Sequence, residues 1–401
     1  MADGRQTRLR LSGMDQAAIA AFLAYAASAV TTPLCLVLLV GEMRLTLAQG
    51  GAIEVARGGM ILAVLLGSAF VAAHWGKARS LGYGLLALGG GAFLYAAARD
   101  YAVVLAAVAL MGAGSGLVEA LINPLVQEQH PDDAGRYLNL VNAFWSVGVM
   151  ASVLAGGEWL TRTDAWRALI AATGGLAFGV GGWFLILDRR KGHVPHHAPR
   201  EVWGHKWDIL RHPRFPLFMA LMALAGAVEG GLTFWTASFI QLHHQGVARA
   251  AGLGTACFAG GMIAGRLAGG WWVAQRHLHR LIILSALAGI GVSLLLPVVE
   301  TLPALYAVLF AAGLAVACFW PSLQAYAVDR MGCEPTALFI LLSCGGIPGF
   351  AGAAWLMGWM GDRAGLPAAM VVLPAGFALL AGIALLERRC PRMRRPYRAR
   401  S

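Results

Sequence analysis

The sequence predicts an all-α integral membrane protein with twelve transmembrane helices in two six-helix halves. Hydrophobic residues make up 58% of the 401 positions and charged residues only 13%, whereas soluble domains average roughly 25% charged residues. The apolar residues gather in about a dozen runs of ~20 residues, the length that crosses a bilayer as a helix. A spacing pattern in the first half also recurs in the second. This composition argues against a soluble enzyme.

The expected helices are apolar runs bounded by charges, glycines and prolines. They lie at residues 16–40, 48–73, 80–98, 101–127, 138–160, 166–187, 215–241, 248–274, 280–299, 302–328, 335–360 and 366–386. Most of the loops between them are short. The exception, residues 188–214, is polar and divides the chain into six helices before it and six after it.

We therefore expect four segments along the chain. They are an N-terminal six-helix bundle at residues 1–187, a cytoplasmic inter-bundle loop at 188–214, a C-terminal six-helix bundle at 215–386 and a basic cytoplasmic tail at 387–401. The arginines of the tail are expected to lie against anionic lipid headgroups.

The distribution of Lys and Arg predicts the orientation, because these residues resist translocation. With the N-terminus inside, 23 of the 31 Lys and Arg residues fall on the cytoplasmic face. Both termini are therefore expected in the cytoplasm of a bacterial-type inner (plasma) membrane. The net charge of +11 is explained by these loops, so it does not indicate nucleic acid. The first run, Gln16–Val40, has no small-residue cleavage site close behind a short apolar core and is expected to be an uncleaved span.

The two halves repeat a pattern of small and polar residues. Gly116, Pro124 and Gln127 recur as Gly313, Pro321 and Gln324 at an offset of 197 residues. At the same offset, Ser146 and Gly148 match Ser343 and Gly345. Six helices plus six with a parallel internal repeat is the architecture of major facilitator transporters.

Ionisable side chains at membrane depth are functional candidates, because each costs about 2.5–3.5 kcal/mol to insert. The expected spans contain Glu54, Arg57, Glu119, Glu229 and Arg266. Glu54 and Arg57 are three residues apart, so they share a helical face and can neutralise each other. They are either a self-contained structural pair or charges that line the outer entrance and respond to substrate. We group them with Arg266 as gating or structural charges.

Glu119 is the main candidate for proton coupling. It lies past the expected midplane of its span, and no basic residue lies one helical turn away. A carboxylate at this depth can load and release a proton as access alternates. The alternative is a structural carboxylate that pairs with a neighbouring helix.

Glu229 is the second coupling candidate and also a candidate for substrate binding. It too has no cation nearby in the sequence, and Phe234 and Trp235 follow it within two turns. A carboxylate beside an aromatic ring suits a sugar or polyol, whose hydroxyls donate to the acid while the ring covers the apolar face. The alternative is helix packing with an interfacial Trp.

Neutral polar and aromatic residues complete the expected substrate site. They lie near proline-marked or glycine-marked helix stretches, where irregular backbone is tolerated if it lines a cavity. The candidates are Asn123, Gln127, Asn142, Trp145, Trp320 and Gln324.

We expect no cofactor, metal or catalytic residue. The chain has no Gly-x4-Gly-Lys-Ser/Thr phosphate loop, and the histidines of His193–His212 lack the paired spacing of metal ligands. The six cysteines also lack metal-site or disulfide-framework spacing and are expected to be free thiols.

The residues from Gly116 to Pro124, Gly-Leu-Val-Glu-Ala-Leu-Ile-Asn-Pro, and the entry Leu138-Asn139-Leu140 to the next span resemble the fucose:proton symporter family of the major facilitator superfamily. Glu229-x5-Trp235 is similar to the Gly-x-Glu-x5-Trp pattern of many relatives. This resemblance implies proton-coupled monosaccharide uptake, with Glu119 in coupling. Two features depart from it: Gln16–Val40 contains no acid, and the stretch Ala69–Lys77 lacks the superfamily's loop aspartate.

The leading interpretation is a secondary active transporter that takes up a sugar or similar polar small molecule with protons by alternating access, as a monomer in the lipid bilayer. One alternative is a proton-coupled exporter of amphipathic compounds. Another is a transporter-like sensor that binds its ligand without moving it. Accumulation under an imposed proton gradient distinguishes a transporter from a sensor. The direction of accumulation distinguishes an importer from an exporter.

We predict that the inter-bundle loop faces the cytoplasm, because of the charge asymmetry. A cysteine introduced at Ala198 should therefore react with a membrane-impermeant thiol reagent only after the cells are opened. Labelling of intact cells would contradict this topology.

Overall fold

The structure is a computed structural model that describes residues 11–130, 134–191, 206–333 and 335–389. Within these ranges all regular structure is helical, with no β-strand, which confirms the predicted class. Eleven helical segments of the described part are long and apolar enough to cross a membrane. The segment at the eighth expected span, α10 (Ala248–Trp272), is not among these eleven.

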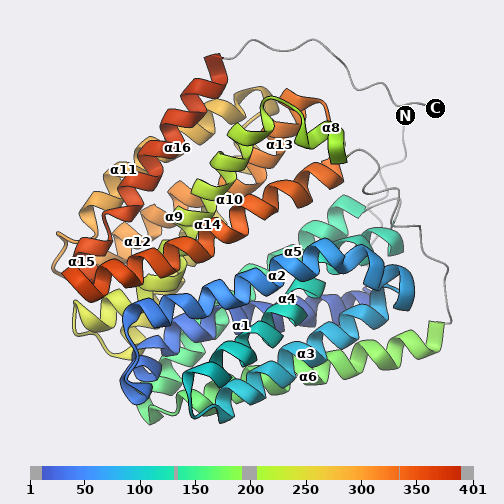
Figure 1. Cartoon of the computed structure of the whole chain (residues 1–401), viewed down its shortest axis with the longest axis horizontal. Helices are drawn as coiled ribbons and strands as arrows, with labels where there is room; N and C mark the ends of the chain where they lie inside the picture. Colours follow the sequence, from blue (N-terminus) through green and yellow to red (C-terminus); the bar gives the residue numbers. More distant parts are fainter. Residues whose placement is uncertain (1–10, 131–133, 192–205, 334, 390–401) are drawn as a thin grey trace.

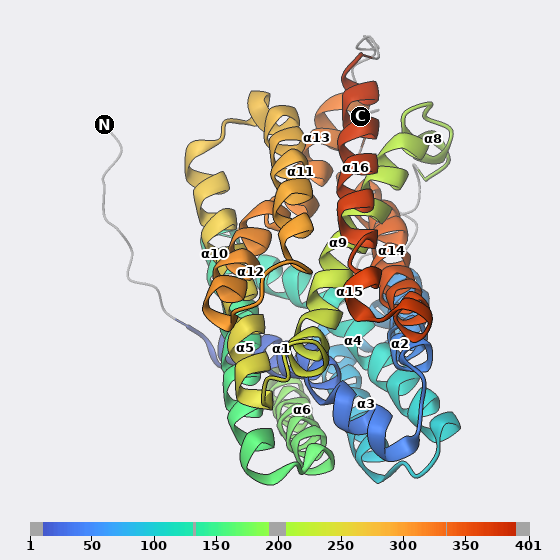
Figure 2. The same cartoon turned by 90° about the vertical axis from the view of Figure 1, so that its left-hand side faces the viewer.

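The N-terminal half holds six long helices (Figures 1 and 2). They are α1 (Gly13–Met43), α2 (Leu47–Trp75), α3 (Lys77–Ala97), α4 (Tyr101–Gln129), α5 (Ala134–Thr163) and α6 (Trp166–Lys191). Local sequence explains several helix starts. Ser12 and Asp15 form a capping box at α1, Thr46 and Gln49 form one at α2, and Asp100 caps α4.

The C-terminal half is more interrupted. Its elements are α8 (Lys206–Leu210), α9 (Phe215–Leu242), α10, the 3₁₀ turn η1 (Gln275–His277), α11 (Leu278–Leu295), α12 (Leu302–Val316), α13 (Phe319–Met331), α14 (Pro335–Ala364), α15 (Leu366–Ala369) and α16 (Val372–Arg389). Two expected helices, at 302–328 and 366–386, are each divided into a pair.

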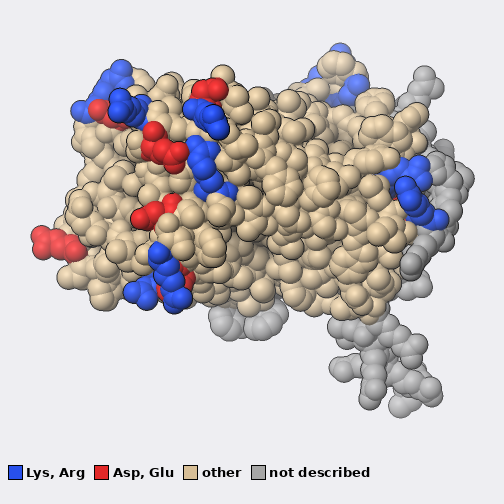
Figure 3. Space-filling model, turned by 90° about the horizontal axis from the view of Figure 1, so that it is seen from below, with Lys and Arg blue, Asp and Glu red and all other residues tan. Residues whose placement is uncertain are grey.

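A broad belt without charged side chains separates the two ends of the molecule in the space-filling view (Figure 3). Large hydrophobic side chains are exposed along the helices, among them Phe70, Phe93, Ile186 and Leu284. Such a surface is typical of a lipid-facing band.

The halves meet along two seams, α2 against α14 and α5 against α10. In the first seam, the backbone N–H groups of Leu47 and Ala48 donate to the carboxylate of Asp362 at 2.7 and 2.9 Å. A Cβ atom at Gly358 would lie 2.3 Å from the carbonyl oxygen of Leu47, so the helices touch backbone to backbone.

The second seam is closed in a similar way. The N–H of Arg249 donates to Oγ1 of Thr161 at 2.7 Å, and its guanidinium lies 3.6 Å from Glu158. These contacts all lie at the helix ends that the charge distribution predicts to face outward. The halves are thus joined at the predicted outer end.

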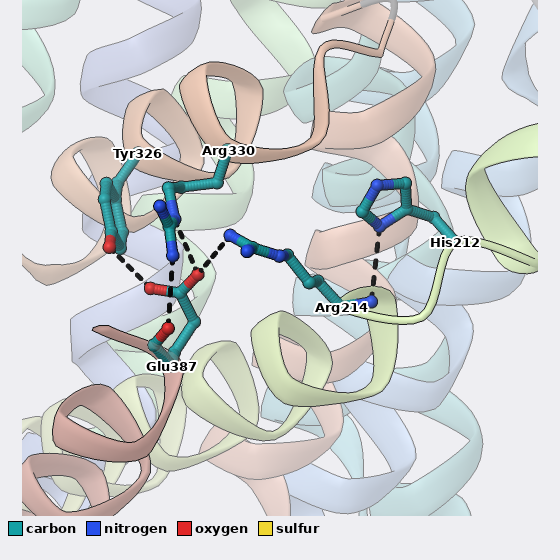
Figure 4. A network of polar contacts seen from close by, with 5 residues as sticks. All are labelled: His212, Arg214, Tyr326, Arg330 and Glu387. Carbon is teal, nitrogen blue, oxygen red and sulfur yellow. Dashed lines mark hydrogen bonds and ion pairs between the residues drawn. The ribbon is translucent and has the colours of Figure 1, made fainter. Parts of the chain in front are cut away.

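A buried ion cluster joins three helices at the opposite end of the C-terminal half (Figure 4). Glu387, with no exposed surface, accepts hydrogen bonds from Arg214 at 2.9 Å, from Arg330 at 2.8 Å and from the hydroxyl of Tyr326. The cluster joins the start of α9 to the ends of α13 and α16. The sequence analysis counted Arg214 and Arg330 only among the Lys and Arg residues of the cytoplasmic face, and it did not single out Glu387.

The N-terminal half has a smaller cluster at the corresponding place. Nε2 of His130 lies 2.9 Å from the fully buried Asp15, and the His130 ring stacks on Tyr137 at 3.5 Å between centroids. This contact joins the start of α1 to the end of α4 and to α5. In both halves, a buried charged group therefore anchors the first long helix.

We expect Glu387→Ala to lower the free energy of unfolding by about 3–5 kcal/mol, because it removes the buried carboxylate that Arg214, Arg330 and Tyr326 share. Glu128→Ala is the matched control, since Glu128 forms a more exposed pair with Lys77 and exposed pairs contribute only about 0–1 kcal/mol. Thermal unfolding in detergent measures both variants. Equal losses of stability would show that the Glu387 cluster does not hold the helices together.

Candidate functional site

The predicted pair of Glu54 and Arg57 forms in the structure. Nε of Arg57 lies 3.0 and 3.2 Å from the two carboxylate oxygens of Glu54, and Nη2 lies 2.9 Å from one of them. Glu54 is 4% exposed. Nη1 of Arg57 is buried and has no hydrogen-bond partner among the described residues. Arg57 therefore keeps one donor group that Glu54 does not use.

Glu119 has neighbours that the sequence did not reveal. The hydroxyl of Tyr25 from α1 interacts with its carboxylate, and Arg57 from α2 lies close enough for the two charges to attract. The Glu119 residue is nevertheless exposed by its accessible surface, so it is not part of the packed core. The cation near Glu119 belongs to another helix. A search for basic residues one helical turn away in the sequence could not find it.

Tyr25 is the site residue that the sequence analysis missed. It was overlooked because the first span was searched only for acids, and a Tyr in an apolar run usually packs. Tyr25 also packs against Trp145 of α5, with ring centroids 4.5 Å apart, and Phe22 lies 6.5 Å from the same ring. Trp145, a predicted site residue, is therefore connected to the coupling candidate Glu119 through Tyr25.

The predicted amides of the N-terminal half come together. Nδ2 of Asn142 donates to Oδ1 of Asn123 at 2.8 Å, and also to the carbonyl of Leu138 at 2.8 Å. Asn142 and Gln127 are exposed, and Asn123 is half-buried. Asn123 and Gln127 follow Glu119 at successive four-residue steps, so the three lie along one side of α4. The side chain of Asn139 lies outside the described residues.

Glu229 also pairs with an arginine of another helix. Oε1 of Glu229 in α9 lies 3.9 Å from Nη2 of Arg266 in α10, and Trp320 of α13 interacts with the same carboxylate. Oε2 of Glu229 is buried without a hydrogen-bond partner among the described residues. Gln324, four residues after Trp320, is half-buried. The predicted residues Glu229, Arg266 and Trp320 thus meet, and one carboxylate oxygen remains available.

The break between α12 and α13 positions Arg266. Nε of Arg266 donates to the carbonyl of Ala317 at 3.3 Å. In a continuous helix that carbonyl would accept from the N–H four residues later, but that residue is Pro321, which has no N–H. The proline therefore frees an acceptor that holds the arginine beside Glu229.

Phe234 and Trp235, which the sequence analysis predicted for the substrate site, pack in the interior of the structure. Both side chains have 0% exposure, and Nε1 of Trp235 donates to the carbonyl of Ala354 in α14 at 2.9 Å. Residues five and six positions apart are rotated by roughly 140° and 240° around a helix, so neither faces the same side as Glu229. The aromatic neighbour of Glu229 is Trp320.

No metal or redox centre emerges in the described part of the chain. It contains no group of three or more His, Cys, Asp or Glu side chains that could hold a metal ion. Cys35, Cys257, Cys318, Cys333 and Cys344 are free thiols. Cys390 and most of the histidine-rich loop lie outside the described residues.

Comparisons with known proteins agree on the fold. A model of the Major Facilitator Superfamily matches residues 17–353. A mutant form of the nucleoside transporter NupG is similar over 94% of this chain and 99% of its own, with 14% identity and a TM-score of 0.79. A bacterial homologue of the human lysosomal transporter Spinster, in an inward-facing and unoccupied conformation, is similar over 95% of this chain and 98% of its own, with 14% identity and a TM-score of 0.78. No curated protein matches the sequence.

We expect Trp235→Phe to lower the free energy of unfolding by about 1–3 kcal/mol, because it removes the buried hydrogen bond to the Ala354 carbonyl and leaves a gap where the larger ring packs. Trp145→Phe is the matched control, since Trp145 is half-buried and its described contacts are aromatic. A ligand that stabilises the wild type should stabilise Trp235→Phe by the same increment and Trp145→Phe by less. The reverse pattern in a thermal-shift assay would show that Trp235 takes part in ligand binding.

Proposed function

Because the chain belongs to the major facilitator superfamily, and is therefore a membrane transport protein rather than an enzyme, we propose that it takes up a neutral polar molecule together with protons. The substrate class is a sugar, a polyol or a nucleoside. Uptake proceeds by alternating access across a bacterial-type inner membrane, with both termini in the cytoplasm and the monomer as the working unit.

The side chains at the site support a neutral polar substrate. Asn123, Asn142 and Gln127 offer amides on one half, and Gln324 offers one on the other. Amides hydrogen-bond to hydroxyls or base edges without requiring a charge on the ligand.

Each half also contributes an aromatic ring to the candidate site. Trp145 lies beside Tyr25 in the N-terminal half, and Trp320 lies beside Glu229 in the C-terminal half. An aromatic face covers the apolar face of a sugar or stacks on a nucleobase. The free oxygen of Glu229 suits a ligand hydroxyl, because a carboxylate is a strong acceptor. NupG, a structural neighbour, is a nucleoside transporter, which adds nucleosides to the candidate class.

Glu119 carries the proton-coupling proposal. It is exposed, whereas Glu54, the other acid within the expected N-terminal spans considered as candidates, is buried and bound bidentately by Arg57. Glu229 lies 3.9 Å from Arg266, so its charge is balanced locally. Among these acids, Glu119 has the accessible carboxylate and the more distant cation, which is the arrangement a proton carrier needs.

The seams support an inward-facing state. The contacts of Asp362 and Arg249 join the halves at the predicted outer end. With that end closed, substrate and protons exchange with the cytoplasmic side.

We expect Glu119→Gln to abolish accumulation of substrate against its gradient, because the side chain can no longer release a proton. Counterflow should survive, since exchange of substrate for substrate requires alternating access but no net proton movement. The assay uses proteoliposomes with an imposed proton gradient. Its substrate is the compound that most stabilises the purified protein in a thermal-shift screen of sugars, polyols, nucleosides and amphipathic cations.

Glu128→Gln, at the end of the same helix, is the control and should accumulate substrate normally. If Glu119→Gln still concentrates substrate, the coupling proton lies elsewhere and Glu229 is the next candidate. Accumulation in the direction opposite to the proton flow would instead identify an exporter.

A further inference from the structure

A surface cavity of about 270 Å³ lies between two helices of the N-terminal half. Its lining consists of Arg79 and Tyr83 of α3 and Leu185 and Arg189 of α6. The two helices lie side by side along one edge of the molecule (Figures 1 and 2). Arg79 is near the start of α3 and Arg189 is near the end of α6, so both arginines lie at the end predicted to face the cytoplasm.

Glycines bring the two helices together on the membrane side of this cavity. A Cβ atom at Gly82 would lie 2.7 Å from Cδ2 of Leu185, and one at Gly181 would lie 2.9 Å from the carbonyl oxygen of Gly82. Nearer the predicted cytoplasmic end, the side chains of Arg79 and Arg189 replace these glycines. The cavity therefore forms where the helices stop touching backbone to backbone.

The charges at the cavity do not cancel. Nε of Arg79 donates to Oδ2 of Asp188 at 2.9 Å, so these two groups neutralise each other. Arg189 is exposed and forms no ion pair with an acid in the described part of the chain. The cavity therefore has one uncompensated positive charge. Guanidinium groups bind phosphate oxygens well, because their planar N–H donors match the phosphate geometry.

Aromatic side chains place the cavity at the level of the lipid headgroups. The ring of Tyr83 lies 5.2 Å from the ring of Trp75, between centroids. Trp75 is 41% exposed and Tyr83 is 42% exposed. Trp and Tyr gather at the membrane–water interface, where one end of the ring system is apolar and the other is wet. An occupant of the cavity is therefore expected to come from the membrane surface.

An exposed apolar strip continues from the cavity into the membrane. Its members share one face of each helix at about 100° per residue: Tyr83, Leu86, Gly90 and Phe93 on α3, and Leu185, Gly182 and Phe178 on α6. The strip is open, since a Cβ atom at Gly90 or Gly182 would meet no other atom within 4 Å. The exposed rings of Phe93 and Phe178, 6.2 Å apart, lie at its far end.

The strip has the length of one lipid chain. From Tyr83 to Phe93 the helix rises roughly 15 Å at ~1.5 Å per residue. This is about half of the ~30 Å hydrocarbon core of a bilayer, and so the depth of one leaflet. A cationic cavity at the headgroup level, continued by an apolar strip of this length, matches a single phospholipid in both parts.

We propose that the cavity and the strip bind one anionic phospholipid of the cytoplasmic leaflet. Its phosphate lies between Arg79 and Arg189, and its acyl chain lies along the strip toward Phe93 and Phe178. Phosphatidylglycerol has the required chemistry, because its single negative charge balances the single excess positive charge of the cavity. A lipid without net charge, such as phosphatidylcholine, leaves that excess in place. The site requires neither Glu119 nor the transported substrate.

Native mass spectrometry of the full-length protein in detergent, titrated with each lipid, measures this preference. The wild type should bind one phosphatidylglycerol at least fivefold more tightly than phosphatidylcholine. Arg189→Gln should lose this preference, and Asp188→Asn should bind phosphatidylglycerol at least twofold more tightly than the wild type. Arg276→Gln is the matched control, because Arg276 is an exposed arginine of the same predicted face in the other half. Equal binding of the two lipids by the wild type, or a preference that persists in Arg189→Gln, would overturn the proposal.

A second pair of variants separates a lipid from a free phosphate ion. Gly182→Leu fills the strip without meeting a neighbouring atom and should weaken binding of phosphatidylglycerol at least fivefold. Gly179→Leu is its control, since Gly179 is equally open but is rotated by roughly 90° from the strip. Inorganic phosphate at the same concentration should not displace the lipid. Displacement by inorganic phosphate, or unchanged lipid binding in Gly182→Leu, would identify a small-anion site and overturn the assignment to a phospholipid.

Discussion

The organisation of this protein depends on the need to balance charge where water is scarce. Three buried or half-buried acids in the helical core each meet an arginine: Glu54 meets Arg57, Glu229 meets Arg266, and Glu387 meets Arg214 and Arg330. Because most of these partners come from other helices, the ion pairs also determine which helices lie together. The positions of α9 beside α10 and of α16 beside α9 are thus coupled to charge as well as to packing.

The sequence predicted the features that depend on local composition and periodicity. Apolar runs located the long helices, the three-residue spacing of Glu54 and Arg57 predicted their pairing, and the predicted amides of α4 and α5 do meet. The sequence did not predict contacts between helices that are far apart along the chain. Neither the approach of Arg57 to Glu119 nor the pairing of Arg266 with Glu229 follows from spacing along the chain, because helix rotation and neighbours are set by packing. The same limit explains why Trp235 was placed in the site although it lies in the core.

The internal repeat predicted equivalent helices in the two halves, but its two prolines lie in different backbone settings. Pro124 lies within the continuous helix α4, whereas Pro321 follows directly on the break between α12 and α13. In the C-terminal half, the carbonyl that the proline leaves unpaired accepts from Arg266. In the N-terminal half, the repeated proline lies in an unbroken helix that carries the exposed Glu119. In the C-terminal half, it follows a helix break whose free carbonyl holds Arg266 beside Glu229 of α9. The two related halves therefore hold their acids in different surroundings.

The contact between α2 and α14 combines two kinds of interaction at the predicted outer end. The hydrogen bonds from Leu47 and Ala48 to Asp362 are exposed, so water can replace them at little cost when the seam opens. The backbone contact at Gly358 has no such substitute, since it leaves no space for even one additional carbon. The two backbones therefore approach each other too closely to accept a side chain as small as a methyl group at Gly358. A methyl group added at Gly358 would therefore have to push α2 and α14 apart at the predicted outer end.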